Sequence, residues 1–295
     1  MMKEFNFRGL GVAMVTPFSR EGEVDYLRLA QLVDNLIQNK VDYLVALGTT
    51  SESPTLTQQE KHEIVRTVVR TAAGRVPVVM GCGGPSTQVV VDKLTHADLS
   101  GVSAILSVTP YYNRPSQEGL IEHYKQIAYH SPLPIILYNV GARTSCNIEA
   151  DTTLLLANEC EKIIAIKEAS GNMNQIMRVV KHRPEGFGVI SGDDAITLPL
   201  LAIGVDGLIS VVANAFPEEV SRMVNLGLSN RFDEACELHQ KLLDVTQACF
   251  KEGNPAGIKA VLALQEKLDY YLRLPLVRVS AAHQQYIKSL LASFS

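Results

Sequence analysis

The chain has 295 residues, of which 46% are hydrophobic and 20% charged, so it can bury a substantial core and extensive disorder is excluded. The formal net charge is -4 and the lysines and arginines are scattered, which leaves no basic face for nucleic acid. The length fits one large barrel-type domain with an appendage, or two domains of ordinary size.

The first residues do not form a secretory signal, because Arg8 and Pro17 interrupt the apolar stretch. No run approaches the roughly 18 consecutive apolar residues of a membrane span, so we expect a cytoplasmic protein without a membrane partner. The cysteines are odd in number, widely spaced and free of any CxxC pair. We therefore expect reduced thiols, no disulfide framework and no metal site.

Short β-branched runs alternate with stretches of helical period as far as about residue 229. In the first predicted helix, VDYLRLAQLVDNLIQ, the buried face is predicted to hold Leu29, Leu32, Val33 and Leu36. The predicted strands cover residues 10–18, 42–48, 76–82, 102–108, 134–140, 162–168, 187–192 and 206–212.

The strand runs are apolar on both faces, which is typical of parallel strands covered on both sides. Eight βα units of this length favour a closed (β/α)8 TIM barrel over residues 1–229 rather than an open doubly wound sheet. Beyond it, residues 230–295 predict a small extension of three amphipathic helices, at 232–250, 254–272 and 280–294.

Active sites of this fold lie at the carboxyl ends of the strands. Polar and aromatic residues follow several predicted strands, and we expect them to gather at one rim. They are GTTSES (48–53), TPYYNRPS (109–116), YNVGARTS (138–145), KEASGN (167–172) and SGDD (191–194).

Lys167 closes the apolar run KIIAIKE, where an ammonium is costly unless it is paired, neutralised or used. One interpretation is a lysine that extends its charged end out of the barrel mouth. The other is a covalent catalyst, because a desolvated amine attacks a keto acid and the resulting protonated Schiff base withdraws electrons.

Such chemistry needs a proton shuttle and groups that bind carboxylates. Tyr138, which ends the preceding strand, can give and take a proton, although it could equally be an aromatic plug. The GTTS turn offers Thr49, Thr50 and successive amides to a carboxylate, a weak signal by itself. Arg143 could form a forked pair with a second carboxylate or be a solvated loop residue.

SGDD argues against a phosphorylated substrate. Barrels that bind phosphate usually do so near the loops after strands seven and eight, where Asp193 and Asp194 put negative charge. The two carboxylates are expected to cap the following helix rather than to act in catalysis.

The motifs GTTSES, TPYYNRPSQEG, YNVGART, IKEASGN, SGDD and GLISVVAN occur in one order and spacing over nearly the whole chain. In this they resemble the dihydrodipicolinate synthase (4-hydroxy-tetrahydrodipicolinate synthase) family, within the class I pyruvate aldolase group that includes N-acetylneuraminate lyase. The resemblance implies the same barrel and a lyase without a cofactor. Its reaction condenses pyruvate with L-aspartate semialdehyde in the diaminopimelate and lysine pathway.

By this resemblance Lys167 forms the Schiff base with pyruvate, and Tyr138 relays protons through Thr49 to Tyr112. Tyr112 would enter the site from a neighbouring subunit, which implies a homotetramer made of two tight dimers. Thr50 would hold the pyruvate carboxylate, Gly192 and Ile209 would line the pocket, and Arg143 would bind the semialdehyde carboxylate.

The chain departs from the family pattern at Ser51 and Ser145, where glycine is usual, and at Gly141, where proline is usual. If the family's glycine at the Ser51 position has a positive φ, serine would be strained there, and loss of the proline would leave the Arg143 loop less constrained.

Many family members are inhibited by lysine. Ser53 and Tyr111 match that effector pocket, but Gln58, Lys61 and GGPS (83–86) do not. Since Lys61 would repel a cationic effector, we expect weak or absent inhibition.

Two alternatives remain open. A sister enzyme would use pyruvate with another aldehyde, such as a sugar acid or an N-acetylneuraminate-type substrate. A non-catalytic sensor of a keto acid or an amino acid would not require Lys167 and Tyr138 together.

Overall fold

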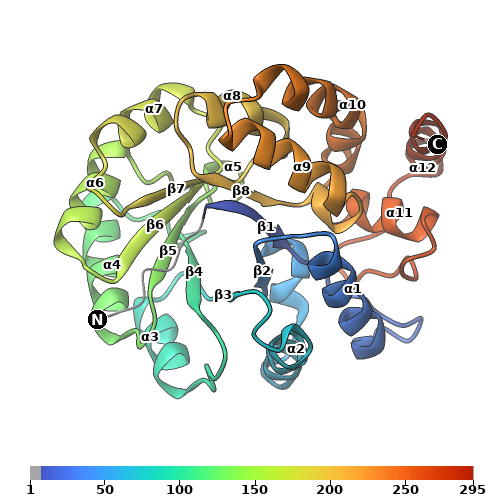
Figure 1. Cartoon of the computed structure of the whole chain (residues 1–295). Helices are drawn as coiled ribbons and strands as arrows, with labels where there is room; N and C mark the ends of the chain where they lie inside the picture. The colour runs from blue at the N-terminus through green and yellow to red at the C-terminus, as the bar shows by residue number, and fades with distance from the viewer. Residues whose placement is uncertain (1–7, 295) are drawn as a thin grey trace.

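The computed structural model describes residues 8–294, and its centre is a closed barrel of eight parallel strands in chain order (Figure 1). The last strand pairs with the first, where Leu208 lies beside Leu10 and Ile209 beside Gly11. The predicted barrel is confirmed. The strands are β1 (Gly9–Ala13), β2 (Tyr43–Ala46), β3 (Val78–Gly81), β4 (Ala104–Val108), β5 (Ile135–Asn139), β6 (Ile163–Glu168), β7 (Gly188–Ser191) and β8 (Gly207–Ser210).

Each strand lies within or overlaps a predicted run, but most of the runs extend further at the carboxyl end. The first run shows why. Beyond Ala13 the side chain of Asn214 takes the place of a neighbouring strand: its Nδ2 donates to Ala13 O at 2.8 Å, and its Oδ1 accepts from Val15 N at 3.1 Å. A side chain from distant sequence thus ends the ladder, and local propensity does not reveal it.

Helices form a ring around the barrel (Figure 1). The first buries Leu29, Leu32, Val33 and Leu36, as predicted. The helices of the ring are α1 (Tyr26–Gln38), α2 (Gln58–Ala72), α3 (Thr87–His96), α4 (Gln117–His130), α6 (Ala150–Glu159), α7 (Met173–His182), α8 (Thr197–Ala202) and α9 (Pro217–Leu228). The four-residue helix α5 (Gly141–Thr144) follows β5 and lies inside this ring (Figure 1). Short 3-10 turns are η1 (Thr49–Ser51), η2 (Ser53–Thr55), η3 (Asp194–Ile196) and η4 (Val212–Asn214).

Apolar side chains fill the inside of the barrel, so a ligand can reach only its mouth. Tyr43 packs so closely against β1 that a Cβ on Gly11 would lie 2.2 Å from its ring. The interior cluster comprises Ala13, Tyr43, Val45, Val79, Ala104, Leu106, Ile136, Tyr138, Val140, Ala165, Ile190 and Ile209.

After the barrel the chain continues into α10 (Phe232–Lys251), α11 (Ala256–Leu264) and α12 (Ala281–Ala292), which lie on one side of the molecule (Figure 1). Leu242 and Val245 of α10 belong to the same hydrophobic cluster as the helices around the barrel. The boundary between residues 1–229 and 230–295 stays a prediction, and residues 1–7 and 295 of those two ranges lie outside the described residues.

The helix predicted at 254–272 is wrong beyond Leu264. Glu266 adopts a left-handed conformation with φ 59°. Its N–H donates to Ala263 O at 3.0 Å and that of Lys267 to Leu262 O at 2.9 Å. This is a Schellman ending. This helix end is not predicted from the sequence, because a glutamate occupies the position that glycine usually takes.

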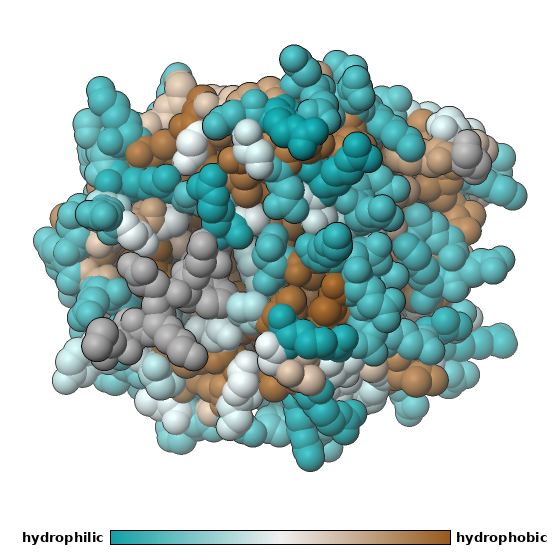
Figure 2. Space-filling model, viewed as in Figure 1, coloured by the Kyte–Doolittle hydropathy of each residue, from teal (hydrophilic) through white to brown (hydrophobic). Residues whose placement is uncertain are grey.

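Hydrophilic side chains cover most of the face seen in Figure 2, with apolar residues in separate patches between them. Within residues 8–294 no helix combines the length and apolar character that a membrane span requires.

Candidate active site

Lys167 and Tyr138 lie side by side inside the barrel, at the carboxyl ends of β6 and β5. The strand ladder pairs their Cα positions, so both side chains point to the same face of the sheet. Both are buried, with 4% of Lys167 and 7% of Tyr138 exposed, and Lys167 Nζ lies 4.3 Å from the centroid of the Tyr138 ring. The two residues singled out from the sequence therefore form one unit.

The next residue of each strand points the other way, out of the barrel wall. Glu168 is buried there and accepts hydrogen bonds from Asn139 Nδ2 at 3.0 Å, Ser170 N at 2.9 Å and Gln175 Nε2 at 3.0 Å. Neutral donors thus satisfy this carboxylate. Among residues 8–294 no carboxylate forms an ion pair with Lys167 Nζ, so the amine is not locked against an acid.

Gly192 lies against the stem of Lys167, and Ile209 lies in the interior of the barrel. A Cβ on Gly192 would lie 2.8 Å from Lys167 Cε, so this position must lack a side chain for the lysine stem to pass. Ile209 on β8 is fully buried and belongs to the interior cluster that includes Tyr138. The role of both residues as walls of a substrate pocket stays a prediction.

Thr49 and Thr50 form the turn η1 directly after β2, at the same rim. Thr50 is buried, with 2% exposed, and its Oγ1 accepts a hydrogen bond from Asn254 Nδ2 at 3.0 Å. Asn254 is not among the site residues predicted from the sequence. The signal available was its place in GNPAGIK, a polar residue just before an unusually apolar helix, but nothing local linked it to a turn 204 positions earlier.

Asn254 also reaches the arginine loop, since Arg143 Nη2 donates to its carbonyl oxygen at 3.4 Å. Arg143 lies exposed on the four-residue helix α5. Asn254 Oδ1 is buried and has no hydrogen-bond partner among the described residues. The structure thus connects Thr50 and Arg143 through one residue of the C-terminal segment.

The unusual serines differ in conformation. Ser51 is not in the left-handed region; the residue there is Glu52, with φ 55°. Ser51 Oγ instead donates to Met14 O at 2.7 Å, which ties the turn to the segment after β1. Ser145 does adopt φ 54°, so serine in place of glycine is strained at the end of α5.

Asp193 caps the turn η3 by accepting from Ala195 N at 3.0 Å, as predicted. Asp194 is buried, and its carboxylate accepts from Ser210 Oγ and from the N–H of Val211, at 3.0 Å for the latter. Burial raises the pKa of Asp194. Backbone donors after β8 that could face a phosphate are therefore occupied by a carboxylate.

The described residues of one chain do not form the predicted proton relay from Tyr138 through Thr49 to Tyr112. Across residues 8–294 no hydrogen bond links the Thr49 hydroxyl to Tyr138 or Tyr112. Tyr112 has φ 74° and is 94% exposed on the loop after β4, beside Tyr111, which is 41% exposed. The roles of Thr49 and Tyr112 stay predictions.

No group of three or more His, Cys, Asp or Glu side chains in the described part of the chain could hold a metal ion. The predictions that the chain needs neither metal nor cofactor remain untested by this geometry.

Comparison with known proteins agrees with the fold and the motifs. The model of the dihydrodipicolinate synthetase family matches residues 6–293. A relative from Parabacteroides distasonis named 4-hydroxy-tetrahydrodipicolinate synthase is 48% identical over 294 residues, covering 100% of this chain and 99% of the relative.

Solved structures of dihydrodipicolinate synthases superimpose on nearly the whole chain. A structure described as the first monomeric dihydrodipicolinate synthase variant superimposes with a TM-score of 0.96 at 37% identity, covering 99% of this chain and 98% of the other. A chloride-inhibited dihydrodipicolinate synthase from Acinetobacter baumannii, described as complexed with pyruvate, gives a TM-score of 0.93 at 35% identity and covers 97% and 98% of the two chains.

Fold, site and relatives together define a TIM-barrel lyase of the class I, Schiff-base type. Within that class, the chain belongs to the dihydrodipicolinate synthetase family.

Proposed function

We infer that the chain condenses pyruvate with L-aspartate semialdehyde to 4-hydroxy-tetrahydrodipicolinate, at the start of diaminopimelate and lysine synthesis. The observation that carries the assignment to these residues is the pair of Lys167 and Tyr138 inside the barrel mouth. The full-length likeness to synthases of that name supports the reaction.

Lys167 is the proposed nucleophile. Its neutral amine adds to the ketone carbon of pyruvate, water leaves, and a protonated Schiff base remains. This cation withdraws electrons from the bond to the adjacent methyl carbon, which loses a proton to give an enamine. The enamine carbon then attacks the aldehyde carbon of the second substrate, and the aldehyde oxygen takes up a proton. The amino group of the second substrate next adds to the Schiff-base carbon, which closes the ring and breaks the bond to Lys167, so that the lysine leaves as a free amine.

Tyr138 is the proposed proton carrier for these steps. The centroid of its ring lies 4.3 Å from Lys167 Nζ, so Tyr138 would lie close to a keto acid bound to that amine. A phenol can donate to the departing water and accept from the methyl carbon in turn. Thr49 and a Tyr112 from a neighbouring subunit would extend this route toward solvent.

Thr50 is the proposed hydrogen-bond donor to the pyruvate carboxylate. Asn254 determines that the Thr50 hydroxyl donates rather than accepts. Because Thr50 Oγ1 accepts from Asn254 Nδ2, its own proton is free to be donated. A donated proton is what a carboxylate needs, and a donor to a charged group forms one of the stronger hydrogen bonds. Gly192 and Ile209 would shape the rest of this pocket.

Arg143 is the proposed partner for the carboxylate of the semialdehyde. Its guanidinium is exposed at the rim, and its contact with the Asn254 carbonyl leaves further N–H groups available to a carboxylate.

We propose a homotetramer of two tight dimers in the cytoplasm, in which the exposed Tyr111 and Tyr112 are buried between subunits.

The test compares aldehydes. Purified protein is given pyruvate with L-aspartate semialdehyde, sugar-acid aldehydes or N-acetylmannosamine, and product is followed by mass. We expect turnover only with the semialdehyde, and Arg143→Ala should lose that turnover by about 10- to 100-fold while still forming the pyruvate adduct. Preferred turnover of another aldehyde would instead assign the chain to a sister enzyme and would make the Gly141 and Ser145 departures functional.

A further inference from the structure

A buried ion pair connects α11 to the turn that follows β2. Lys259 Nζ lies 2.5 Å from Glu52 Oε1, and both side chains are 0% exposed. The same nitrogen donates to Tyr271 O at 3.0 Å and lies 4.2 Å from the centroid of the Phe18 ring. Burial lowers the pKa of Lys259 to about 8, against the opposing effect of Glu52.

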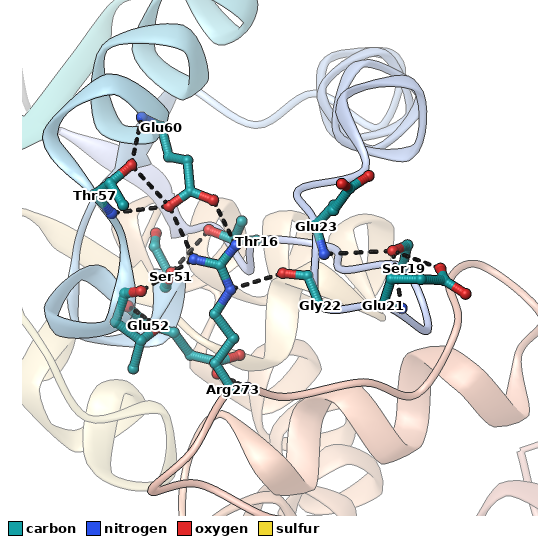
Figure 3. A network of polar contacts seen from close by, with 11 residues as sticks. Thr16, Ser19, Glu21, Gly22, Glu23, Ser51, Glu52, Thr57, Glu60 and Arg273 are labelled. Atoms are coloured by element: carbon teal, nitrogen blue, oxygen red, sulfur yellow. Dashed lines mark hydrogen bonds and ion pairs between the residues drawn. The ribbon is translucent and has the colours of Figure 1, made fainter.

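The second oxygen of Glu52 is also held by the C-terminal segment, because Glu52 Oε2 accepts from Arg273 N at 3.0 Å. The Arg273 side chain then turns toward the start of α2, where it pairs with Glu60, and donates to Gly22 O at 2.8 Å (Figure 3). Both carboxylate oxygens of Glu52 are thus fixed from outside the barrel.

Glu52 needs such anchoring because it adopts a left-handed conformation, which is unfavourable for a non-glycine residue. Its own N–H closes the turn η1 on Thr49 O at 3.2 Å, and its carbonyl accepts from Thr55 N at 2.9 Å. Rotation of Glu52 would therefore move the turn that carries Thr49 and Thr50.

We propose that the Glu52–Lys259 pair positions the Thr49–Thr50 turn for the keto acid, so that the C-terminal helices set the affinity for the first substrate. The proposal rests on the proposed function of Thr50. Asn254 acts from the same segment, on Thr50 itself, and Lys259 acts on the residue two positions further along. The pair does not touch the substrate; it acts through the turn.

The experiment separates positioning from simple stability. Lys259→Met and Glu52→Gln each leave one buried charge without its partner, and each should lower Tm by about 6 °C or more. The double variant removes both charges and should recover most of that loss, because replacing both members of a buried pair is often neutral. Pyruvate affinity is then measured as the concentration that gives half of the borohydride-trapped adduct on Lys167.

We expect the half-saturating pyruvate concentration to rise about tenfold in both single variants and in the double variant, with the maximal extent of trapping unchanged. A double variant with recovered Tm and normal pyruvate affinity would overturn the proposal, since the pair would then be structural only. Lys267→Met is the matched control. Its Nζ lies in the same segment and donates to Ala215 O at 2.8 Å, so its loss should leave pyruvate affinity unchanged.

The two proposals fail differently. Absence of any adduct in the unaltered protein would refute the proposed function itself. Normal adduct formation with equal pyruvate dependence in all variants would refute only the positioning role of Glu52 and Lys259.

Discussion

Lys167 and Tyr138 are Cα partners on adjacent strands, and the lysine nitrogen lies 4.3 Å from the centre of the tyrosine ring. The ladder that joins β5 and β6 sets this relationship, and Asn139 and Glu168 repeat it on the outer face with a hydrogen bond of 3.0 Å. The proposed catalytic pair is therefore held by backbone and side-chain bonds behind it rather than by flexible loops. Such rigidity is what a covalent mechanism requires of its first two groups.

Replacing Tyr138 by phenylalanine should keep the ring beside Lys167 and remove only the hydroxyl. We expect kcat to fall by about 10²- to 10⁴-fold, the range typical of a lost acid–base group, with little change in Tm. Steady-state kinetics and a thermal melt check this. A variant with near-normal kcat would show that Tyr138 is only a packing residue, the alternative its sequence context also allows.

Replacing Asn254 by alanine should weaken pyruvate binding because Thr50 Oγ1 loses its fixed donor. We expect KM for pyruvate to rise by about 3- to 10-fold, the usual worth of one hydrogen bond, with kcat less affected. Asn158→Ala is the control, since that exposed amide donates to a carbonyl of its own helix α6. Equal behaviour of the two variants would contradict the role given to Asn254.

The sequence predicts the barrel and the central pair for a physical reason. Parallel strands buried on both faces appear as apolar runs, and residues at their carboxyl ends meet at one rim. The positions of Lys167 and Tyr138 at the rim therefore follow from local pattern, whereas the roles predicted for them come from the family resemblance.

The contacts from the C-terminal segment could not be found in this way. Lys259 and Glu52 are 207 positions apart, and no helical or strand period relates them. One signal was available: Lys259 is the only charged residue of AGIKAVLAL, a helix that is otherwise apolar, and such a lysine needs a buried partner. The identity of that partner requires the fold.

The ion pair between Glu60 and Arg273 predicts how the stability of the protein changes with pH. A hydrogen bond from Arg273 lowers the pKa of Glu60 from 4.5 to about 2. Since the folded pKa lies below the unfolded one, the stabilisation is complete above about pH 4.5 and is lost as pH falls toward 2. We expect Glu60→Gln to lower the free energy of unfolding at pH 7 by about 1 kcal/mol, because both partners are partly exposed.

The difference between the unaltered protein and Glu60→Gln should shrink as urea melts are repeated from pH 5 downward. Glu234→Gln serves as the control, since its pair with Arg231 is 47% and 58% exposed and should contribute almost nothing. A difference that stays constant from pH 7 to pH 3 would argue against the ion pair as the source of stabilisation.

Lysine should inhibit the enzyme weakly or not at all. Lys61 is half-buried on α2, and burial together with the charge of Lys93 lowers its pKa, which indicates a site already unfavourable to another cation. Initial rates at increasing L-lysine check this, and Lys61→Gln should be more sensitive than the unaltered protein. Inhibition of the unaltered protein at sub-millimolar lysine would refute the prediction.

The most direct measurement is the intact mass of the protein after incubation with pyruvate and borohydride, followed by peptide mapping. The account predicts one reduced three-carbon adduct per chain, located on Lys167, and none in Lys167→Arg. A protein that remains unmodified under saturating pyruvate, or an adduct located on another lysine, would contradict it.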